Sequence, residues 1–404
     1  MSRLWQLIRR GVLGQGSTIG NSIILFGDSI SLANEVHPTD NGFFNWANVL
    51  FRHKFKVIRN TGVGGNTTTQ MLARLNTDVI AYRPRWVCVL GGANDIVGDV
   101  GADTIYNNLV SICSILRGCG INVILCTITP TSSMNSEART TVYDTVNTNL
   151  RAYAAANPKI VFADIGEEYR NTGSAYAIPL DTYTHDGTHP SALGAGVLGL
   201  KMYADIKDHS LVEKAPTFAV LPTTNDTGNQ IYFNVYCNPL MTGTTGWKTA
   251  PAAGTVATGW VVSGGGTWSK VARTDGLPGE WQQVVIGDEG LATLAQYDVT
   301  DKFSVGDTIY SQIEIESDDN WTDPSAFTLY LAALNASNSV LVSAQGLGHS
   351  AGGGSGSVII NPRFGVVRTA PIVIPATTTK LRIYCALYAT AGTVRFSRFE
   401  TKKL

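Results

Sequence analysis

The chain has 404 residues, of which 44% are hydrophobic and only 15% are charged, which is ample for buried cores and argues against extended disorder. This length predicts two or three domains rather than one. Thirty basic and thirty-one acidic residues give a net charge of −1, so the composition lacks the basic excess typical of nucleic-acid binding. No apolar run reaches the roughly 18 residues of a membrane span.

The six cysteines predict neither a disulfide framework nor a metal centre. Cys88 and Cys126 lie within the apolar runs WVCVL and VILCTI, where a buried free thiol is expected. No CxxC pair or Cys/His cluster has the spacing of a zinc site. We therefore expect no metal site in this protein.

The first segment, residues 1–22, combines apolar residues with arginines at positions 3, 9 and 10. These charges interrupt the apolar stretch, which argues against a cleaved signal peptide and predicts an amphipathic arm. If the protein works outside a cell, another route must deliver it.

Residues 23–212 alternate between short apolar runs and amphipathic helical patterns. Strands are expected at 23–26, 56–60, 86–90, 122–128 and 160–163, and helices at 42–55, 67–82, 104–117, 137–156 and 193–204. This alternation is typical of a parallel sheet covered by helices on both faces. Ligands bind such sheets at the carboxyl ends of the strands.

The composition changes near residue 213. Residues 213–228 carry the proline, threonine and glycine signals of a linker, and residues 229–404 consist of short β-rich runs between turn residues. Strands are expected at 231–236, 259–262, 282–286, 308–315, 327–331, 340–344, 358–360, 372–374, 380–387 and 393–399, with a loop over 349–357. This pattern predicts an all-β domain, either a jelly-roll-like sandwich or a barrel.

The first chemical motif is Gly27-Asp28-Ser29, directly after the first expected strand. A serine on a tight glycine turn at the ligand edge of a parallel sheet occupies the position of a nucleophile. The alternative is that Ser29 only caps the next helix. We expect Asp28 to hold the turn through hydrogen bonds from its side chain to the backbone.

Two further motifs follow the next expected strands. The sequence NTGVGGN at 60–66 presents backbone N–H groups ahead of a helix, which suits a developing oxyanion. The sequence GGAND at 91–95 places Asn94 at the same edge, where its amide can donate a hydrogen bond. The alternatives are an ordinary glycine turn and an Asn that bonds its own backbone. Asp95 is expected to support the Asn94 loop.

The fourth motif is DGTH at 186–189, just before the last expected helix. A histidine can take the hydroxyl proton and return it to the leaving group, and an aspartate three residues earlier can hold its tautomer. The alternative is an exposed Asp-x-x-His with no function. Asp164 follows the fifth strand and is expected to be structural, with orientation of a histidine as the alternative. His185 is expected to be a solvent-exposed loop residue, with lining of the site as the alternative.

In this order the motifs resemble the signature blocks of the SGNH (GDSL-type) hydrolases: GDS, a glycine after N-x-G, G-x-N-D and D-x-x-H. The resemblance covers about residues 22–210 and implies a flavodoxin-like three-layer α/β/α fold. It implies that Ser29 is the nucleophile, that His189 is the general base and acid, and that Asp186 orients the histidine.

The resemblance also implies an oxyanion hole made of the Ser29 N–H, the Gly65 N–H and the Asn94 side chain. Gly64 lies next to Gly65, and a shift by one residue would exchange them. The first block reads GDSI rather than GDSL, and Ile30 needs only to pack behind the nucleophile. The implied chemistry is acyl transfer to water through an acyl-enzyme, which needs no metal or organic cofactor.

The second half resembles β-sandwich carbohydrate-binding or receptor-binding modules of glycan-active enzymes and phage tail proteins. Tryptophans there could stack on sugar rings, although we expect at least three of the five in the core: Trp247, Trp260, Trp268, Trp281 and Trp321. An esterase joined to such a module favours a serine acetylesterase that removes O-acetyl groups from a polysaccharide.

Two alternatives stay open. The first is a small-ester or lipid esterase with a structural β domain, which would need a large apolar acyl pocket. The second is a phage tail or receptor-binding protein with secondary or no hydrolase activity, for which a trimer would be expected. The favoured hypothesis predicts an acylated carbohydrate or small ester as partner, no nucleic acid, and action outside a cell or on a virion.

Overall fold

The computed structural model describes residues 21–34, 42–213, 231, 238–287, 290–318, 326–346, 365–389 and 391–404. Nearly all of the expected arm (1–22) and linker (213–228) lies outside these residues. The same holds for most of the strand expected at 231–236, for the strand at 358–360 and for the loop at 349–357. Within the described part, no helix is long and apolar enough to cross a membrane.

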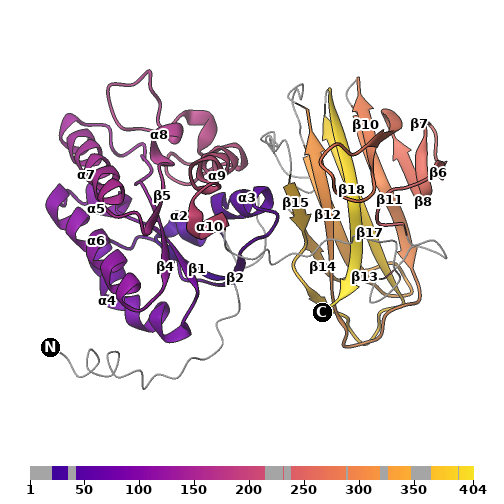
Figure 1. Ribbon diagram of the computed structural model, residues 1–404, viewed down its shortest axis with the longest axis horizontal. Helices are drawn as coiled ribbons and strands as arrows, with labels where there is room; N and C mark the ends of the chain where they lie inside the picture. Colours follow the sequence, from indigo (N-terminus) through magenta and orange to yellow (C-terminus); the bar gives the residue numbers. More distant parts are fainter. Residues whose placement is uncertain are drawn as a thin grey trace. The chain divides into compact units, whose positions relative to one another are not determined.

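The described residues form two compact units. The first comprises 21–34, 42–44 and 54–213, and the second comprises 45–53 and the described residues from 231 onward. The first unit is α/β and the second is rich in β-strands (Figure 1).

The α/β unit contains a five-stranded sheet in the order β2-β1-β3-β4-β5. Its strands are β1 (Ser22–Gly27), β2 (Lys56–Asn60), β3 (Trp86–Leu90), β4 (Asn122–Cys126) and β5 (Ile160–Ala163). All neighbours pair in parallel, and β1, β3 and β4 are buried along their whole length, as two covered faces require. This strand order is the flavodoxin-like one, so the expected architecture is confirmed.

Helices flank this sheet and supply much of its core. They are α2 (Ser29–Leu32), α4 (Thr68–Asp78), α5 (Ala93–Val97), α6 (Ala102–Gly118), α7 (Glu137–Ala156), α8 (Gly166–Tyr169), α9 (Ala192–Ile206) and α10 (Ser210–Glu213). Helix α3 (Phe43–Leu50) is divided between the units, with its first two residues in the first unit and the rest in the second. Figure 1 shows α4, α6 and α7 side by side along the sheet. Their apolar residues, including Leu75, Ile112 and Leu150, join sheet residues in one buried cluster. Cys88 and Cys126 are buried and free, as expected.

Two expected helices end earlier than their patterns. The helix expected at 67–82 ends as α4 at Asp78, because Val79 leaves the helical conformation, and a separate 3₁₀ turn covers Ile80–Tyr82. The periodicity over 42–55 predicted a continuous helix, but α3 ends at Leu50. Arg52 and His53 have φ values of 55° and 50°, in the left-handed region that interrupts a right-handed helix. The apolar spacing was correct for the first two turns, and Phe55 belongs to the core just before β2.

The second unit contains two mainly antiparallel sheets. One has the order β15-β12-β18-β10-β9-β7 with β16 beside β12, and the other has the order β14-β13-β17-β11-β8-β6. The strands are β6 (Thr245–Lys248), β7 (Ala253–Gly254), β8 (Val256–Gly264), β9 (Thr267–Ala272), β10 (Glu280–Ile286), β11 (Gly290–Val299), β12 (Thr308–Ser317), β13 (Ala326–Leu334), β14 (Val340–Gln345), β15 (Gly365–Arg368), β16 (Ile372–Val373), β17 (Lys380–Ala389) and β18 (Gly392–Lys403). Trp260 of β8 stacks on Phe399 of β18 with ring centroids 5.2 Å apart, so the two sheets pack on each other.

The tryptophans of this unit follow the expectation. Trp260, Trp268 and Trp281 are buried in the core, whereas Trp247 on β6 is 49% exposed. Trp321 lies outside the described residues. The β-rich character predicted for this half is therefore confirmed, while its jelly-roll connectivity stays a prediction.

The sequence patterns missed several strands of the second unit, namely β6, β7, β9, β11 and β15. The missed strands are short, exposed or rich in small residues. β6 (TGWK) has no buried residue, and β11 begins GLATLA. Such segments are held by pairing with neighbours rather than by their own alternation, and pairing is not visible in a local pattern.

Candidate active site

Ser29 is the first residue of α2, which begins directly after β1. The preceding Asp28 is the N-cap, and its Oδ1 accepts a hydrogen bond from the Ile30 N–H at 3.0 Å, which confirms the role expected for this side chain. Ser29 is partly exposed. Within the described part of the chain its hydroxyl makes no hydrogen bond, so it is free to react.

The pKa of Asp28 reflects the electrostatic surroundings of this turn. Burial raises the pKa of its carboxyl to about 6, while the hydrogen bond from Ile30 and the nearby imidazole of His189 act to lower it. This electrostatic effect of His189 on Asp28 is in line with the expectation that the fourth motif lies near the turn that carries Ser29.

Asn60, at the end of β2, holds the Ser29 helix. Its Nδ2 donates to the carbonyl oxygens of Ser31 and Leu32 at 2.9 and 3.1 Å, and its Oδ1 accepts from the Gly62 N–H at 2.9 Å. Position 62 has no room for a side chain, because a Cβ there would lie only 2.3 Å from the Leu32 nitrogen and 2.8 Å from the Asp28 carbonyl oxygen. The Asn-x-Gly motif thus packs directly on the turn that carries Ser29, a role that the sequence does not predict.

Residues 63–66 form a tight turn beside it, closed by a hydrogen bond from the Asn66 N–H to the Val63 oxygen at 3.2 Å. Gly65 has a φ of 75°, as the third residue of a type II turn requires. Neither the Gly64 nor the Gly65 N–H has an acceptor among the described residues. Both amides are available to a ligand, and hydrogen bonding alone does not separate them.

Asn94 lies in the first turn of α5, after β3. Its Nδ2 donates to the Asn66 oxygen at 3.0 Å, which joins the third motif to the glycine turn. An amide group carries two hydrogens, so one of them remains for a bound oxyanion. The neighbouring Asp95 does more than support its own loop, because it accepts hydrogen bonds from the N–H and the hydroxyl of Thr68.

Arg74 is a site-supporting residue that the sequence did not reveal. Its guanidinium donates to the Gly27 and Thr61 oxygens, both at 2.6 Å, and to Asn66 Oδ1 at 2.8 Å. It also lies over the Phe26 ring, 4.6 Å from the centroid. One side chain therefore links the ends of β1 and β2 to the glycine turn. No local signal marks it, because it occupies an ordinary position within α4.

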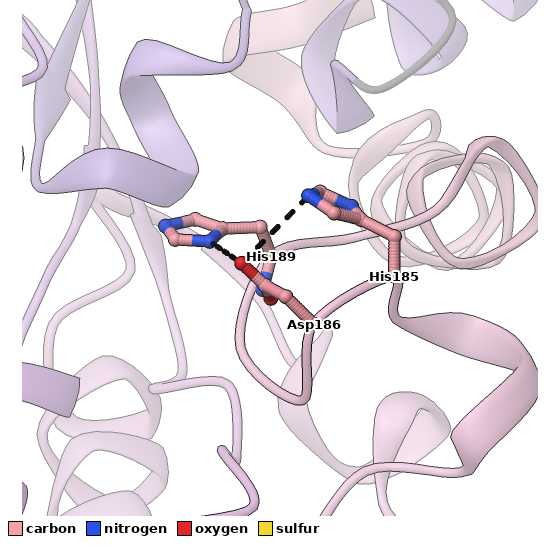
Figure 2. Close-up of side chains that lie close together, drawn as sticks. All are labelled: His185, Asp186 and His189. Atoms are coloured by element: carbon pink, nitrogen blue, oxygen red, sulfur yellow. Dashed lines mark hydrogen bonds and ion pairs between the residues drawn. The ribbon is translucent and has the colours of Figure 1, made fainter.

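The fourth motif forms a closed hydrogen-bonded loop around Asp186 (Figure 2). His189 Nδ1 lies 2.6 Å from Asp186 Oδ2, and the His189 and Thr188 N–H groups donate to Asp186 Oδ1 at 2.8 and 2.9 Å. Partial burial acts to raise the pKa of Asp186, but these hydrogen bonds outweigh it and hold the pKa well below its usual range. An ionised Asp186 keeps the proton on Nδ1 and leaves Nε2 of His189 as an acceptor.

The loop is anchored to the rest of the unit on both sides. Thr184 and Pro190 form an isolated bridge, and the Thr184 hydroxyl donates to the His189 oxygen at 2.8 Å. From the loop after β4, the Ser132 N–H donates to the Gly187 oxygen at 2.7 Å. The position of the histidine is therefore set by the backbone and not only by its own side chain.

The remaining candidates behave as expected. The His185 side chain is 53% exposed, and its ring stacks beside that of His189 with centroids 5.9 Å apart. Asp164 pairs with Arg151 at 2.7 Å, in line with a structural role. The structure thus joins Asp186 to His189 directly. Among the described residues no hydrogen bond joins His189 to Ser29, and that half of the expected triad stays a prediction.

Comparisons with known proteins relate the first part of the chain to ester hydrolases. Residues 25–197 match the model of the GDSL-like Lipase/Acylhydrolase family. Among curated proteins, an acetylxylan esterase of Geobacillus stearothermophilus is 28% identical over 89 residues, which is 19% of this chain and 41% of that protein. The chain therefore matches less than half of the length of this relative.

Solved structures similar to the chain include two hydrolases. One is an acylhydrolase described as putative from Bacteroides fragilis, with a TM-score of 0.39 and 24% identity, covering 51% of this chain and 96% of that chain. The other is a catalytic mutant of an acetylxylan esterase from Geobacillus stearothermophilus, with a TM-score of 0.40 and 19% identity, covering 47% of this chain and 95% of that chain.

Proposed function

We propose that this chain, an ester-cleaving hydrolase with a GDSL-like acylhydrolase domain, is a serine acetylesterase that removes O-acetyl groups from a polysaccharide. Ser29 is the nucleophile, His189 is the general base and acid, and Asp186 orients the histidine. The observation that carries the proposal is the 2.6 Å hydrogen bond between His189 Nδ1 and Asp186 Oδ2. It is supported by the place of Ser29 directly after β1, with a hydroxyl that makes no hydrogen bond among the described residues.

In the proposed first half-reaction, Nε2 of His189 takes the Ser29 proton as the serine oxygen attacks the ester carbonyl. Asp186 is already ionised because its pKa is held low, so it stabilises the imidazolium that forms. The imidazolium then protonates the alcohol oxygen, which leaves, and an acyl-serine remains. Water attacks this ester in the second half-reaction, with His189 again as base, and releases the carboxylic acid.

The oxyanion of each tetrahedral intermediate is proposed to bind three donors, namely the N–H groups of Ser29 and Gly65 and the side chain of Asn94. Two contacts support this assignment. The hydrogen bond from Asn94 to the Asn66 oxygen brings the amide against the glycine turn, and the N–H of Gly65 has no acceptor among the described residues. Donors fixed before reaction act on the transition state without reorganisation.

Two observations support a carbohydrate ester as substrate. The curated relative is named an acetylxylan esterase, so the likeness favours an acetylated glycan, although it covers only part of both chains. In the second unit, Trp247 is 49% exposed on β6 and is the described tryptophan of that unit available to stack on a sugar ring.

The decisive experiment measures hydrolysis of p-nitrophenyl acetate, butyrate and octanoate by the wild-type protein and by Ser29→Ala. Acetate release from acetylated xylan and other acetylated polysaccharides is measured in parallel. We expect the acetyl ester to be hydrolysed fastest, acetate to be released from a glycan, and Ser29→Ala to lose both activities. The Ser29→Ala variant should keep its free energy of unfolding within about 0.5 kcal/mol, since it loses no hydrogen bond.

Other outcomes would redirect the proposal. A preference for octanoate without release from any glycan would support the small-ester or lipid esterase. Equal activity of wild type and Ser29→Ala would refute the serine mechanism. A catalytically inactive wild type with intact folding would leave a binding protein, such as a tail component, as the better hypothesis.

A further inference from the structure

We propose that His185, Asp186 and His189 form a binding site for a zinc-class divalent cation, and that its occupation reversibly switches off the esterase. The inhibitory part of this inference rests on the proposed role of His189 as the base. The site itself rests on the positions of the three side chains. It gives a role to His185, which the proposed catalytic mechanism does not use.

The three side chains bring ligand atoms together on one loop (Figure 2). One ligand atom from each residue lies within 4.8 Å of the others, and His185 Nε2 is 3.7 Å from Asp186 Oδ2. Zinc binds imidazole nitrogen and carboxylate oxygen at about 2.0–2.2 Å, so two ligands of a tetrahedral ion lie about 3.3 Å apart. The His185–Asp186 separation is close to this value without any rearrangement of the loop.

The second nitrogen of His185 orients the ring for metal binding. Nδ1 lies 3.2 Å from the Pro190 carbonyl oxygen. A carbonyl can only accept a hydrogen bond, so the proton resides on Nδ1 and the lone pair on Nε2 faces Asp186. Histidines that bind metals commonly donate their other N–H to a carbonyl in this way. The His185 N–H also donates to the His189 oxygen at 3.2 Å, which fixes the spacing of the two histidines.

The cation would disrupt the hydrogen bond between His189 and Asp186, on which the proposed mechanism depends. The 2.6 Å between His189 Nδ1 and Asp186 Oδ2 is shorter than the about 3.3 Å between two ligands of one ion, so an ion binds both only if it displaces the hydrogen between them and moves them apart. His189 would then lose the partner that sets its tautomer, and the base would be blocked. The side chains of His185, Asp186 and His189 are 53%, 43% and 34% exposed, so an ion reaches them from solvent.

The ligand set also selects the kind of ion. Two imidazoles and one carboxylate suit zinc and similar transition metals, whereas magnesium and calcium prefer oxygen ligands alone. The sequence spacing of these residues matches no common zinc motif, and for that reason the sequence predicted no metal site. The stacked arrangement of the two rings, 24° apart in plane, arises only when the loop closes.

The first experiment titrates Zn²⁺ into the metal-free full-length protein by calorimetry. The proteins are the wild type, Ser29→Ala, His185→Gln and the control His209→Gln, which removes a histidine outside the site. We expect one saturable site in wild type, Ser29→Ala and His209→Gln, and an affinity weakened by about tenfold or more in His185→Gln, since even outer-shell partners of a metal are worth 10–100-fold. Absence of Zn²⁺ binding in wild type, or equal binding by His185→Gln, would overturn the site.

The second experiment follows p-nitrophenyl acetate hydrolysis during the same titration. We expect inhibition with a midpoint at the calorimetric Kd and recovery with EDTA. Relative to its own metal-free rate, His185→Gln should require at least about tenfold more Zn²⁺ for inhibition than the wild type does. Binding at the site without inhibition would overturn the regulatory role. Normal Zn²⁺ binding by a protein inactive on every ester would leave the site standing and would refute the esterase instead, so the two failures are distinguishable.

Discussion

The carboxylate of Asp95 accepts two hydrogen bonds from Thr68, one from the backbone N–H at 2.8 Å and one from the hydroxyl at 2.7 Å. Both residues are fully buried, and burial raises the pKa of Asp95 while the two hydrogen bonds oppose this shift. Asp95 belongs to the helix that carries Asn94, and Thr68 begins α4. The pair therefore forms a buried link between α5, which carries Asn94, and α4, which follows the glycine turn.

We predict that Asp95→Ala destabilises the protein and slows catalysis. The buried N–H and hydroxyl of Thr68 would lose their acceptor, which costs about 1–3 kcal/mol in the free energy of unfolding. Because Asn94 loses its support, kcat should fall more than KM rises. Urea denaturation and steady-state kinetics measure the two effects. Asp103→Ala, at an exposed position of α6, should change stability by no more than about 0.5 kcal/mol. A fully stable Asp95→Ala would contradict the prediction.

Asn94→Ala tests the proposed oxyanion hole. Loss of one donor that acts mainly in the transition state should lower kcat by about 10²–10³-fold with a small change in KM. The variant also loses the hydrogen bond to Asn66, so its folding is checked by circular dichroism. Asn107→Ala, an exposed asparagine of α6, is the matched control. An unchanged kcat in a folded Asn94→Ala protein would exclude Asn94 from the oxyanion hole.

Arg74→Lys tests whether one guanidinium positions the nucleophile turn. A lysine keeps the charge but cannot reach the Gly27, Thr61 and Asn66 oxygens together. We expect a loss of about 1–3 kcal/mol in the free energy of unfolding and a lower kcat at similar KM, since Arg74 acts through the backbone and not on substrate. Arg85→Lys, at an exposed position before β3, should leave both quantities unchanged. A drop in stability with kcat intact would make Arg74 purely structural.

Asp28→Asn tests the buried carboxyl behind Ser29. Burial raises the pKa of Asp28 from 3.8 to about 6, so ionisation costs the folded state more than the unfolded state. The contribution of Asp28 to stability is fully present below about pH 4 and is lost as the pH rises through about 6. Asparagine keeps an oxygen for the Ile30 N–H and cannot ionise.

The stability of Asp28→Asn relative to wild type should therefore rise between about pH 4 and pH 7, by up to about 3 kcal/mol for two pKa units, and then stay level. Urea denaturation at pH 4, 5, 6, 7 and 8 measures this difference, with the exposed Asp103→Asn as control. A difference that does not depend on pH would show that the carboxyl of Asp28 is not perturbed by its burial.

Many helices and strands of the α/β unit can be predicted from local sequence patterns. The strands β2, β3 and β5 and helix α7 begin and end where the sequence places them, because buried parallel strands are continuous apolar runs and long helices repeat at 3.6 residues. Helices α3 and α4 are exceptions, since the left-handed Arg52 and His53 end α3 early and the non-helical Val79 ends α4. In the second unit the pattern found the strongly apolar strands and missed β6 and β11, which depend on neighbouring strands.

Sequence motifs alone single out the residues proposed to carry the chemistry, Ser29, Asn94, Asp186 and His189, because each belongs to a short motif next to a predicted element. They also predict the Asp186–His189 pair, since the partners are three positions apart. The side chains that hold these motifs in place are visible only in the folded chain. Asn60 reaches Ser31 across 29 residues and Arg74 reaches Gly27 across 47. Such contacts leave no periodic or spacing signal, because they exist only when the carboxyl ends of parallel strands have been brought to one edge of the sheet.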